Sequence, residues 1–261
     1  MKKKTFIPIA VVGVGALFAG AKNPKEYWSN IVQKRDLITD VPKSHWLIND
    51  YFEPNPETSN KNDKIYSKRG SFLSDIAFDP IEFGVPPNVA PAIDTSQLLA
   101  LIVAKQVLND VSNDQIQQLD LSKTSVILGT SVLEAIQYLS ARIQRPIWAK
   151  ALYEIGLSEN LVNEACDRIA NSYPKWQEDS FPGLLSNVVA GRIANRFNCG
   201  GSNFTTDAAC ASSLAAVLAA VNELQLERAD MTITGGVDTL NDLLMYKCFN
   251  VVTALSPSGK C

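Results

Sequence analysis

Apolar residues recur along the chain in two patterns: short runs typical of buried strands, and longer stretches with helical spacing. The strand pattern occurs at residues 7–14, 124–128, 203–206 and 231–234. The helical pattern occurs at residues 23–35, 96–108, 134–178, 184–197 and 211–227. Strands alternating with helices indicate an α/β fold.

The most regular unit lies near the end of the chain. Strand 203–206 leads through the small-residue turn Asp207-Ala208-Ala209-Cys210 into helix 211–227, and strand 231–234 follows. A strand, helix and strand in this order predict the crossover of a parallel sheet. Alanines and leucines cover every face of the first half of the helix, so we expect that half to be buried all round.

Two interpretations fit the start of the chain. Three lysines followed by an apolar run as far as Ala21 have the layout of a secretory signal peptide. Residues 7–14 fit equally well a buried strand followed by a glycine-rich turn. The run is too short to span a membrane as a helix.

Two other segments carry local signals. Residues 40–65 form a polar, proline-containing stretch that predicts a long loop. In the helical stretch 134–178, Ser158 is a candidate N-cap, and one helix face would carry Leu161, Ala165 and Ile169.

Composition narrows the class of protein. The 261 residues suffice for a large core, and 24 Lys plus Arg against 27 Asp plus Glu leave no basic excess for nucleic acid binding. The five cysteines are scattered without a C-x-x-C pair, so neither a zinc site nor a redox dithiol is indicated. A reducing, cytoplasmic setting fits best.

Cys210 carries the candidate chemistry. It lies where a strand passes into a helix, so free N–H groups and the positive end of the helix dipole point toward it. A thiolate is stabilised in such a place, and the same N–H groups could donate to the oxyanion of a thioester under attack. The alternative from position alone is that Cys210 is a small buried residue, as most free cysteines are.

The other candidate motifs do not indicate a binding or catalytic site. Gly13-x-Gly15 lacks the third glycine of a dinucleotide fingerprint at Phe18, and no lysine followed by Ser or Thr completes a phosphate loop after Gly20. Ser212 and Ser213 are not in a G-x-S-x-G elbow, so we expect them to pack or cap the helix start.

The stretch TTDAACASSLAAVLAAVNELQLERADMTITGGVDT, beginning at Thr205, resembles the active-site segment of the β-ketoacyl synthases. Their pattern is Asp-x-Ala-Cys-x-Ser-Ser, a long buried helix, and a strand ending in Gly-Gly-Val. Further landmarks resemble the family in the right order: IAVVGVGALFAGAKNPKEYWSNI, RDLITDVPKSHW, KRGSFLSDIAFDPIEFGVPP, SNVVAGRIANRF and VVTALSPSGKC. The resemblance covers residues 6–261 and favours a first core strand over a signal peptide.

The resemblance implies both fold and chemistry. The chain would be the N-terminal half of a thiolase-like fold, with a mixed five-stranded sheet, helices on both faces, and a helical insertion at about 134–178. Cys210 would take an acyl group from the phosphopantetheine of an acyl carrier protein, and its N–H would be one oxyanion donor. Decarboxylative Claisen condensation with malonyl-carrier protein would follow. The intact protein would be a homodimer with no cofactor or metal of its own.

Departures from the family pattern point to a subfamily. Ala208 stands where many members have Thr, and AIDTSQLLALI replaces a more polar helix entrance. With the insertion, these features resemble the synthases of polyunsaturated fatty acid synthases and of heterocyst glycolipid-type polyketide synthases.

One absence keeps a second hypothesis open. The family's condensation uses two histidines in its C-terminal half, whereas this sequence contains one histidine, His45, which we interpret as structural or solvated. The sequence ends within a family motif, as a gene fragment, a partial sequence or a piece of a split synthase would. The alternative function is a noncatalytic chain that folds only with a partner and exposes an apolar face by itself.

Overall fold

The structure is a computed structural model that describes residues 7–61, 63–111, 120–131 and 133–260. The chain divides into two compact units. Unit 1 comprises Met1–Ala10, Phe78–Ala104 and Asn113–Thr239, and unit 2 comprises Val11–Ala77, Lys105–Ser112 and Leu240–Cys261. Within the described residues, no helix combines the length and the apolar character needed to cross a lipid bilayer.

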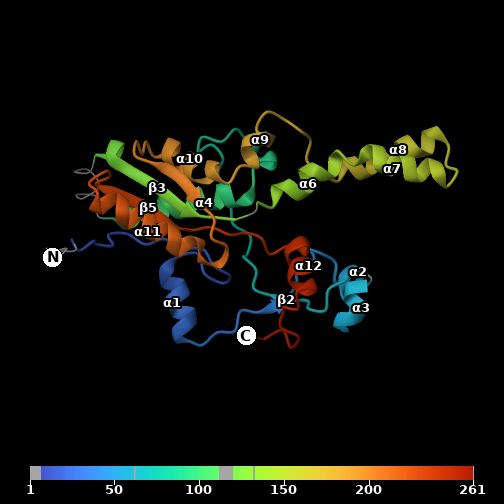
Figure 1. Ribbon diagram of the computed structural model, residues 1–261, viewed down its shortest axis with the longest axis horizontal. Helices are drawn as coiled ribbons and strands as arrows, with labels where there is room; N and C mark the ends of the chain where they lie inside the picture. Colours follow the sequence, from blue (N-terminus) through green and yellow to red (C-terminus); the bar gives the residue numbers. More distant parts are fainter. Residues whose placement is uncertain (1–6, 62, 112–119, 132, 261) are drawn as a thin grey trace, which may run out of the picture. The chain divides into compact units, whose positions relative to one another are not determined.

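Unit 1 is built on a parallel three-stranded sheet (Figure 1). Its strands are β3 (Thr124–Gly129), β4 (Asn203–Thr206) and β5 (Met231–Gly236), in the order β4-β3-β5. Every residue of β3 is buried, so both faces of the sheet at this strand are covered. The predicted parallel crossover is confirmed, with β3 inserted between the two strands that the crossover joins.

Helix α11 (Ser212–Gln225) packs on the sheet through a stripe of small residues. Ala216 and Ala220 lie against Ile127 of β3. Leu214 and Leu218 on the other side are 72% and 62% exposed. We predicted that the first half of this helix is buried on all sides. That prediction is wrong for the described residues, because the sheet covers one side of α11 and no described layer covers the other.

Further helices complete unit 1. Helix α10 (Asn187–Arg196) contacts β3 and β4. The other helices that begin in this unit are η1 (Ala90–Ala92), α4 (Thr95–Asp110), η2 (Leu121–Lys123), α6 (Ala135–Arg142), α7 (Arg145–Glu154), α8 (Glu159–Asn171), α9 (Ser180–Gly183) and η3 (Ala209–Ala211).

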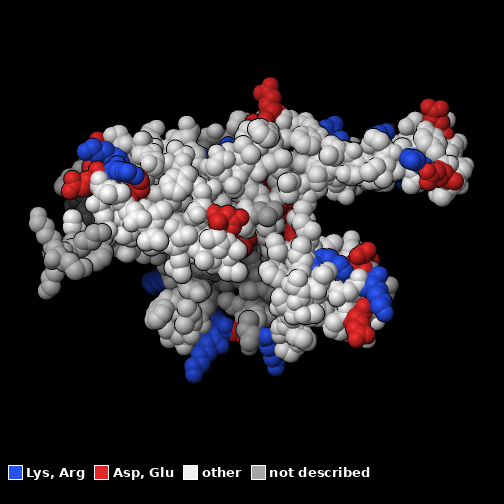
Figure 2. Space-filling model, viewed as in Figure 1, with Lys and Arg blue, Asp and Glu red and all other residues white. Residues whose placement is uncertain are grey.

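Helices α7 and α8 form an antiparallel hairpin within the segment predicted as helical (Figure 1). An ion pair of 2.7 Å joins Arg145 of α7 to Asp167 of α8. Figure 2 shows both acidic and basic side chains at the end of the hairpin. The buried face of α8 carries Val162, Cys166 and Ala170. It is shifted by one residue from the predicted face, because the packing against α7 rather than the apolar pattern alone selects it. Ser158 is the N-cap residue, but its side chain makes no capping bond.

Residues 7–17 contain no strand, which corrects the predicted first strand. A strand needs a neighbouring backbone ladder, whereas the N–H groups of Val14 and Ala16 donate to the side chains of Asp110 (2.9 Å) and Gln106 (3.2 Å). Val11 is 83% exposed. Among the described residues the strands form one three-stranded sheet and one two-stranded sheet, not the single five-stranded sheet expected.

Unit 2 holds the two-stranded sheet and a small core. Antiparallel strands β1 (Thr39–Asp40) and β2 (Arg69–Gly70) pair in it. Its core residues are Val41, Trp46, Ile65 and Tyr246. The helices that begin in this unit are α1 (Pro24–Val32), α2 (Ile48–Tyr51), α3 (Pro56–Lys61) and α12 (Leu243–Val251). The predicted loop 40–65 thus contains two short helices and a strand residue.

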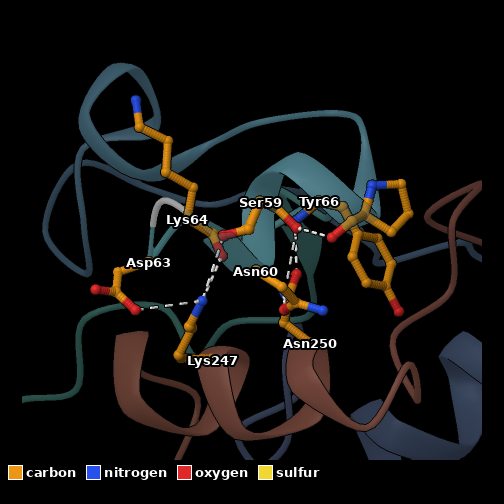
Figure 3. A network of polar contacts seen from close by, with 8 residues as sticks. Ser59, Asn60, Asp63, Lys64, Tyr66, Lys247 and Asn250 are labelled. Atoms are coloured by element: carbon orange, nitrogen blue, oxygen red, sulfur yellow. Dashed lines mark hydrogen bonds and ion pairs between the residues drawn. The ribbon is translucent and has the colours of Figure 1, made fainter.

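Asn250 of α12 is the centre of a polar network that holds residues 59–61 and 63–66 (Figure 3). Its side chain is fully buried, accepts from the N–H of Tyr66 at 2.7 Å, and donates to Ser59 and Asn60. Lys247, one turn earlier, donates to the carbonyl oxygens of Ser59 and Lys64. Side chains of α12 therefore satisfy backbone groups that the irregular segment cannot pair by itself.

Candidate active site

Cys210 lies at the junction predicted from the sequence. Strand β4 ends at Thr206, the short helix η3 spans Ala209–Ala211, and α11 begins at Ser212. The Cys210 thiol is exposed and free. The alternative that this cysteine is a small buried residue is therefore wrong in the described structure.

Side chains within the turn hold its backbone. The N–H of Ala208 donates to the Ser212 hydroxyl at 2.8 Å, and that hydroxyl donates to the carbonyl oxygen of Ala209 at 2.7 Å. The N–H of Ala209 donates to the Asp207 carboxylate at 2.9 Å. These bonds support Ala209 at a φ of 49°, a left-handed conformation that disfavours a residue with a β-carbon by about 1–2 kcal/mol.

The same bonds leave the N–H of Cys210 available. The amides of Ala208 and Ala209 are used as described, and that of Ala211 donates to the carbonyl oxygen of Ala208 at 3.0 Å. No described residue accepts from the N–H of Cys210. A carbonyl oxygen brought against the thiol would find this donor beside the attacking sulfur.

Two glycines let the turn sit directly on the strand ends. A β-carbon on Gly129, the last residue of β3, would lie 2.3 Å from the carbonyl carbon of Ser212. A β-carbon on Gly236, the last residue of β5, would lie 2.8 Å from the β-carbon of Ser213. Bare backbone at both positions is what allows α11 to start at the carboxyl edge of the sheet, with Cys210 exposed beyond it.

A buried polar network lies elsewhere in unit 1, at the start of α4. Gln97 is fully buried, donates to the carbonyl oxygens of Pro182, Gly183 and Leu185, and accepts from Arg192 at 2.7 Å. Burial lowers the pKa of Arg192, and Asp179 at 3.7 Å opposes that effect. The sequence pattern did not single out Gln97, although a glutamine on the apolar side of a leucine-rich helix was a usable signal.

Asp94 has a comparable place at the same helix entrance. Its buried carboxylate accepts from the N–H groups of Ser96 and Ala135, both at 2.9 Å. The entrance that looked less polar than the family pattern is therefore held by Asp94 and Gln97. Arg192 also lines a cavity of about 310 Å³, together with Phe83, Val85 and Leu101.

His45 lies in unit 2 and has local contacts. Its ring meets that of Phe72 edge-on, with centroids 4.7 Å apart, and its Nδ1 is 3.4 Å from the Ser44 hydroxyl. Burial lowers the pKa of His45, and the charge of Asp242 partly opposes this. These contacts agree with the structural interpretation of this histidine.

A comparison with models of protein families identifies the family of this chain. The model of the beta-ketoacyl synthase N-terminal domain matches residues 7–261. The chain belongs to the beta-ketoacyl synthase family. The match begins within the apolar run at the start of the chain, so that run is part of the family domain, as the resemblance implied.

Related beta-ketoacyl synthase sequences come from fatty acid and polyketide assembly. The chain is 34% identical over 249 residues to a polyunsaturated fatty acid synthase polypeptide of Thraustochytrium sp., covering 95% of this chain and 9% of the relative. It is 29% identical to polyketide synthase PksN of Bacillus subtilis, covering 97% of this chain and 4% of the relative. The chain thus spans less than a tenth of either relative.

Solved ketosynthases share the fold. The ketosynthase from module 6 of the bacillaene synthase from Bacillus subtilis aligns with a TM-score of 0.69 and 26% identity, covering 97% of this chain and 35% of that one. The Streptomyces albus oxazolomycin ketosynthase domain OzmH KS7 aligns with a TM-score of 0.74 and 24% identity, covering 96% of this chain and 37% of that one. The thiolase-like α/β fold predicted from the motifs is confirmed.

Proposed function

We propose that this chain is the nucleophile-bearing part of a 3-oxoacyl-acyl-carrier-protein synthase, with Cys210 as its acyl acceptor. The observation that carries the proposal is the exposed Cys210 thiol at the start of α11, beside an N–H with no acceptor among the described residues. Family membership supports it, since the turn lies within the matched domain.

The first step is acyl transfer. The Cys210 thiol gives up its proton, its sulfur attacks the carbonyl carbon of an acyl thioester, and the carbonyl oxygen becomes an oxyanion facing the Cys210 N–H. The intermediate collapses to acyl-cysteine, and the carrier thiol leaves with a proton. The acyl donor is a phosphopantetheine thioester on an acyl carrier protein, and no cofactor is consumed.

The second step forms the carbon-carbon bond. A malonyl thioester loses carbon dioxide, and the resulting enolate carbon attacks the carbonyl carbon of acyl-Cys210. The Cys210 thiolate leaves, and the product is a 3-oxoacyl thioester on the carrier. The family's condensation uses two histidines in its C-terminal half, whereas His45 is the single histidine of this sequence. The described site by itself therefore supports acyl transfer, and the intact homodimeric synthase is proposed to carry out condensation in the cytoplasm, where thiols stay reduced.

The test is acylation of the protein by an octanoyl-carrier protein. Mass spectrometry of peptides should find the octanoyl group on Cys210, and Cys210→Ala should abolish it. Cys248, another exposed cysteine, provides the matched control, because Cys248→Ala should leave the adduct unchanged. An adduct that survives Cys210→Ala would overturn the proposal.

A second candidate is a chain that requires a partner and does not condense by itself. The exposed leucines of α11, Leu214 and Leu218, favour it, since such a face is normally covered. Octanoyl transfer to Cys210 without any 3-oxoacyl product from malonyl-carrier protein would identify this case.

A further inference from the structure

The side chain of Ser212 joins the turn before Cys210 to the first turn of α11. Its hydroxyl accepts from the N–H of Ala208 at 2.8 Å and donates to the carbonyl oxygen of Ala209 at 2.7 Å. It also lies 3.5 Å from the Asp207 carboxylate. One hydroxyl thus uses both its acceptor and its donor capacity on the backbone immediately preceding Cys210.

Packing alone does not call for a serine here. Ser212, Ala216 and Ala220 are four residues apart and form the buried stripe of α11. Alanine fills the other two places of that stripe and is the stronger helix former. The hydroxyl, rather than the volume, is therefore what distinguishes Ser212.

We infer that Ser212 is a positioning residue for Cys210, an inference that rests on the proposed role of Cys210 as acyl acceptor. By taking up the Ala208 N–H and bracing Ala209 at its positive φ, Ser212 keeps the turn in the conformation that leaves the Cys210 N–H available. The sulfur and the N–H of Cys210 then face the same thioester carbonyl.

The inference separates two reactions of the same sulfur. Attack on a thioester builds an oxyanion that needs the Cys210 N–H in place, and the pantetheine thiol leaves with a proton. Alkylation by iodoacetamide displaces iodide and builds no oxyanion. Loss of the Ser212 hydroxyl should therefore slow acyl transfer far more than alkylation.

The experiment compares Ser212→Ala with Ser213→Ala in the full chain. Ser213 is the adjacent residue, exposed and with no hydrogen bond from its hydroxyl to a described residue. With octanoyl-pantetheine, acylation of Cys210 should fall at least about tenfold in Ser212→Ala and remain unchanged in Ser213→Ala. Iodoacetamide labelling of Cys210 should stay within about twofold in both variants.

A direct readout of geometry accompanies the rates. Hydrogen exchange of the Ala208 amide should speed up at least about tenfold in Ser212→Ala and not in Ser213→Ala. This measurement needs no acylation. An absence of octanoyl transfer to the parent protein would count against Cys210 as acyl acceptor, whereas unchanged exchange would count against Ser212.

Besides unchanged hydrogen exchange, three kinetic results would overturn the inference. One is acylation of Ser212→Ala at the parent rate, and another is an equal loss of acylation and alkylation, which indicates a general packing role. If Ser212→Ala does not fold, Ser212→Thr retains the hydroxyl and should be acylated within about threefold of the parent. A folded Thr variant that is acylated about tenfold more slowly would be the third.

Discussion

A β-carbon on Gly129 would lie 2.3 Å from the carbonyl carbon of Ser212, a separation that real side chains do not reach. The end of β3 and the first residue of α11 are therefore in backbone contact. This contact sets the height of the Cys210 turn above the sheet, because the turn immediately precedes Ser212 in the chain.

Replacing Gly129 by alanine should destabilise unit 1 and slow the acylation of Cys210. Backbone on both sides has little room to move, so we expect a loss of about 2 kcal/mol or more in the free energy of unfolding. Gly191 of α10 is the matched control: its added β-carbon would approach only the Asn203 side chain, at 3.7 Å. Urea unfolding should leave Gly191→Ala at or above the parent stability. Equal stability of the two variants would refute the contact.

The four described cysteines should differ in reactivity with iodoacetamide. Cys210 and Cys248 are exposed, whereas Cys166 and Cys199 are buried. Burial raises the pKa of Cys199, so that thiol should stay protonated and unlabelled at about pH 8. Cys248 lies inside α12, away from a helix start, so Cys210 should be labelled about tenfold faster than Cys248 near pH 7. Mass spectrometry of peptides over time checks the order, and equal rates would argue against activation of Cys210.

Gln97→Leu should be among the most destabilising single changes in unit 1. The leucine removes a side-chain donor from three carbonyl oxygens and an acceptor from the half-buried Arg192, and we expect a loss of about 3 kcal/mol. Gln144→Leu is the control, because Gln144 is exposed and should change stability by less than about 0.5 kcal/mol. Denaturant unfolding measures both, and a loss below about 1 kcal/mol for Gln97→Leu would contradict the role of the network.

Tyr246 should make the stability of unit 2 depend on alkaline pH. Burial raises its pKa to about 12, while its hydroxyl donates to the carbonyl oxygen of Arg69 at 3.0 Å. An unfolded tyrosine ionises near pH 10, so the contribution of Tyr246 is complete below that pH and is lost as the pH rises toward about 12.

The comparison of Tyr246→Phe with Tyr153→Phe isolates this effect. Stability should fall less between about pH 9 and pH 11.5 in Tyr246→Phe than in the parent. Tyr153 is 48% exposed, and its replacement should leave the pH dependence unchanged. Identical pH profiles for Tyr246→Phe and the parent would refute the prediction.

The local elements near Cys210 could be predicted because their signals are local. The strand 203–206 coincides with β4, and the crossover helix and the next strand were placed within a few residues of α11 and β5. Each combines a run of one apolar pattern with a turn of small residues at its end. The family resemblance depended on the same stretch and was confirmed.

The predictions that failed depended on neighbours distant in the chain. Residues 7–17 have strand-like composition but find no ladder partner among the described residues. The buried face of α8 is shifted by one residue, and the outer face of α11 is exposed. An apolar pattern states which residues would benefit from burial, but burial itself requires another layer.

The sequence by itself determined the crossover, the family and the position of Cys210 between strand and helix, because periodicity and short-range turn chemistry are written in adjacent residues. Tertiary structure alone decided that the Ser212 hydroxyl holds the Ala208 amide, that Gly129 lies under the helix start, and that Gln97 pairs with Arg192. Such bonds depend on distances between groups brought together by the chain path, and no residue pattern specifies those distances in advance.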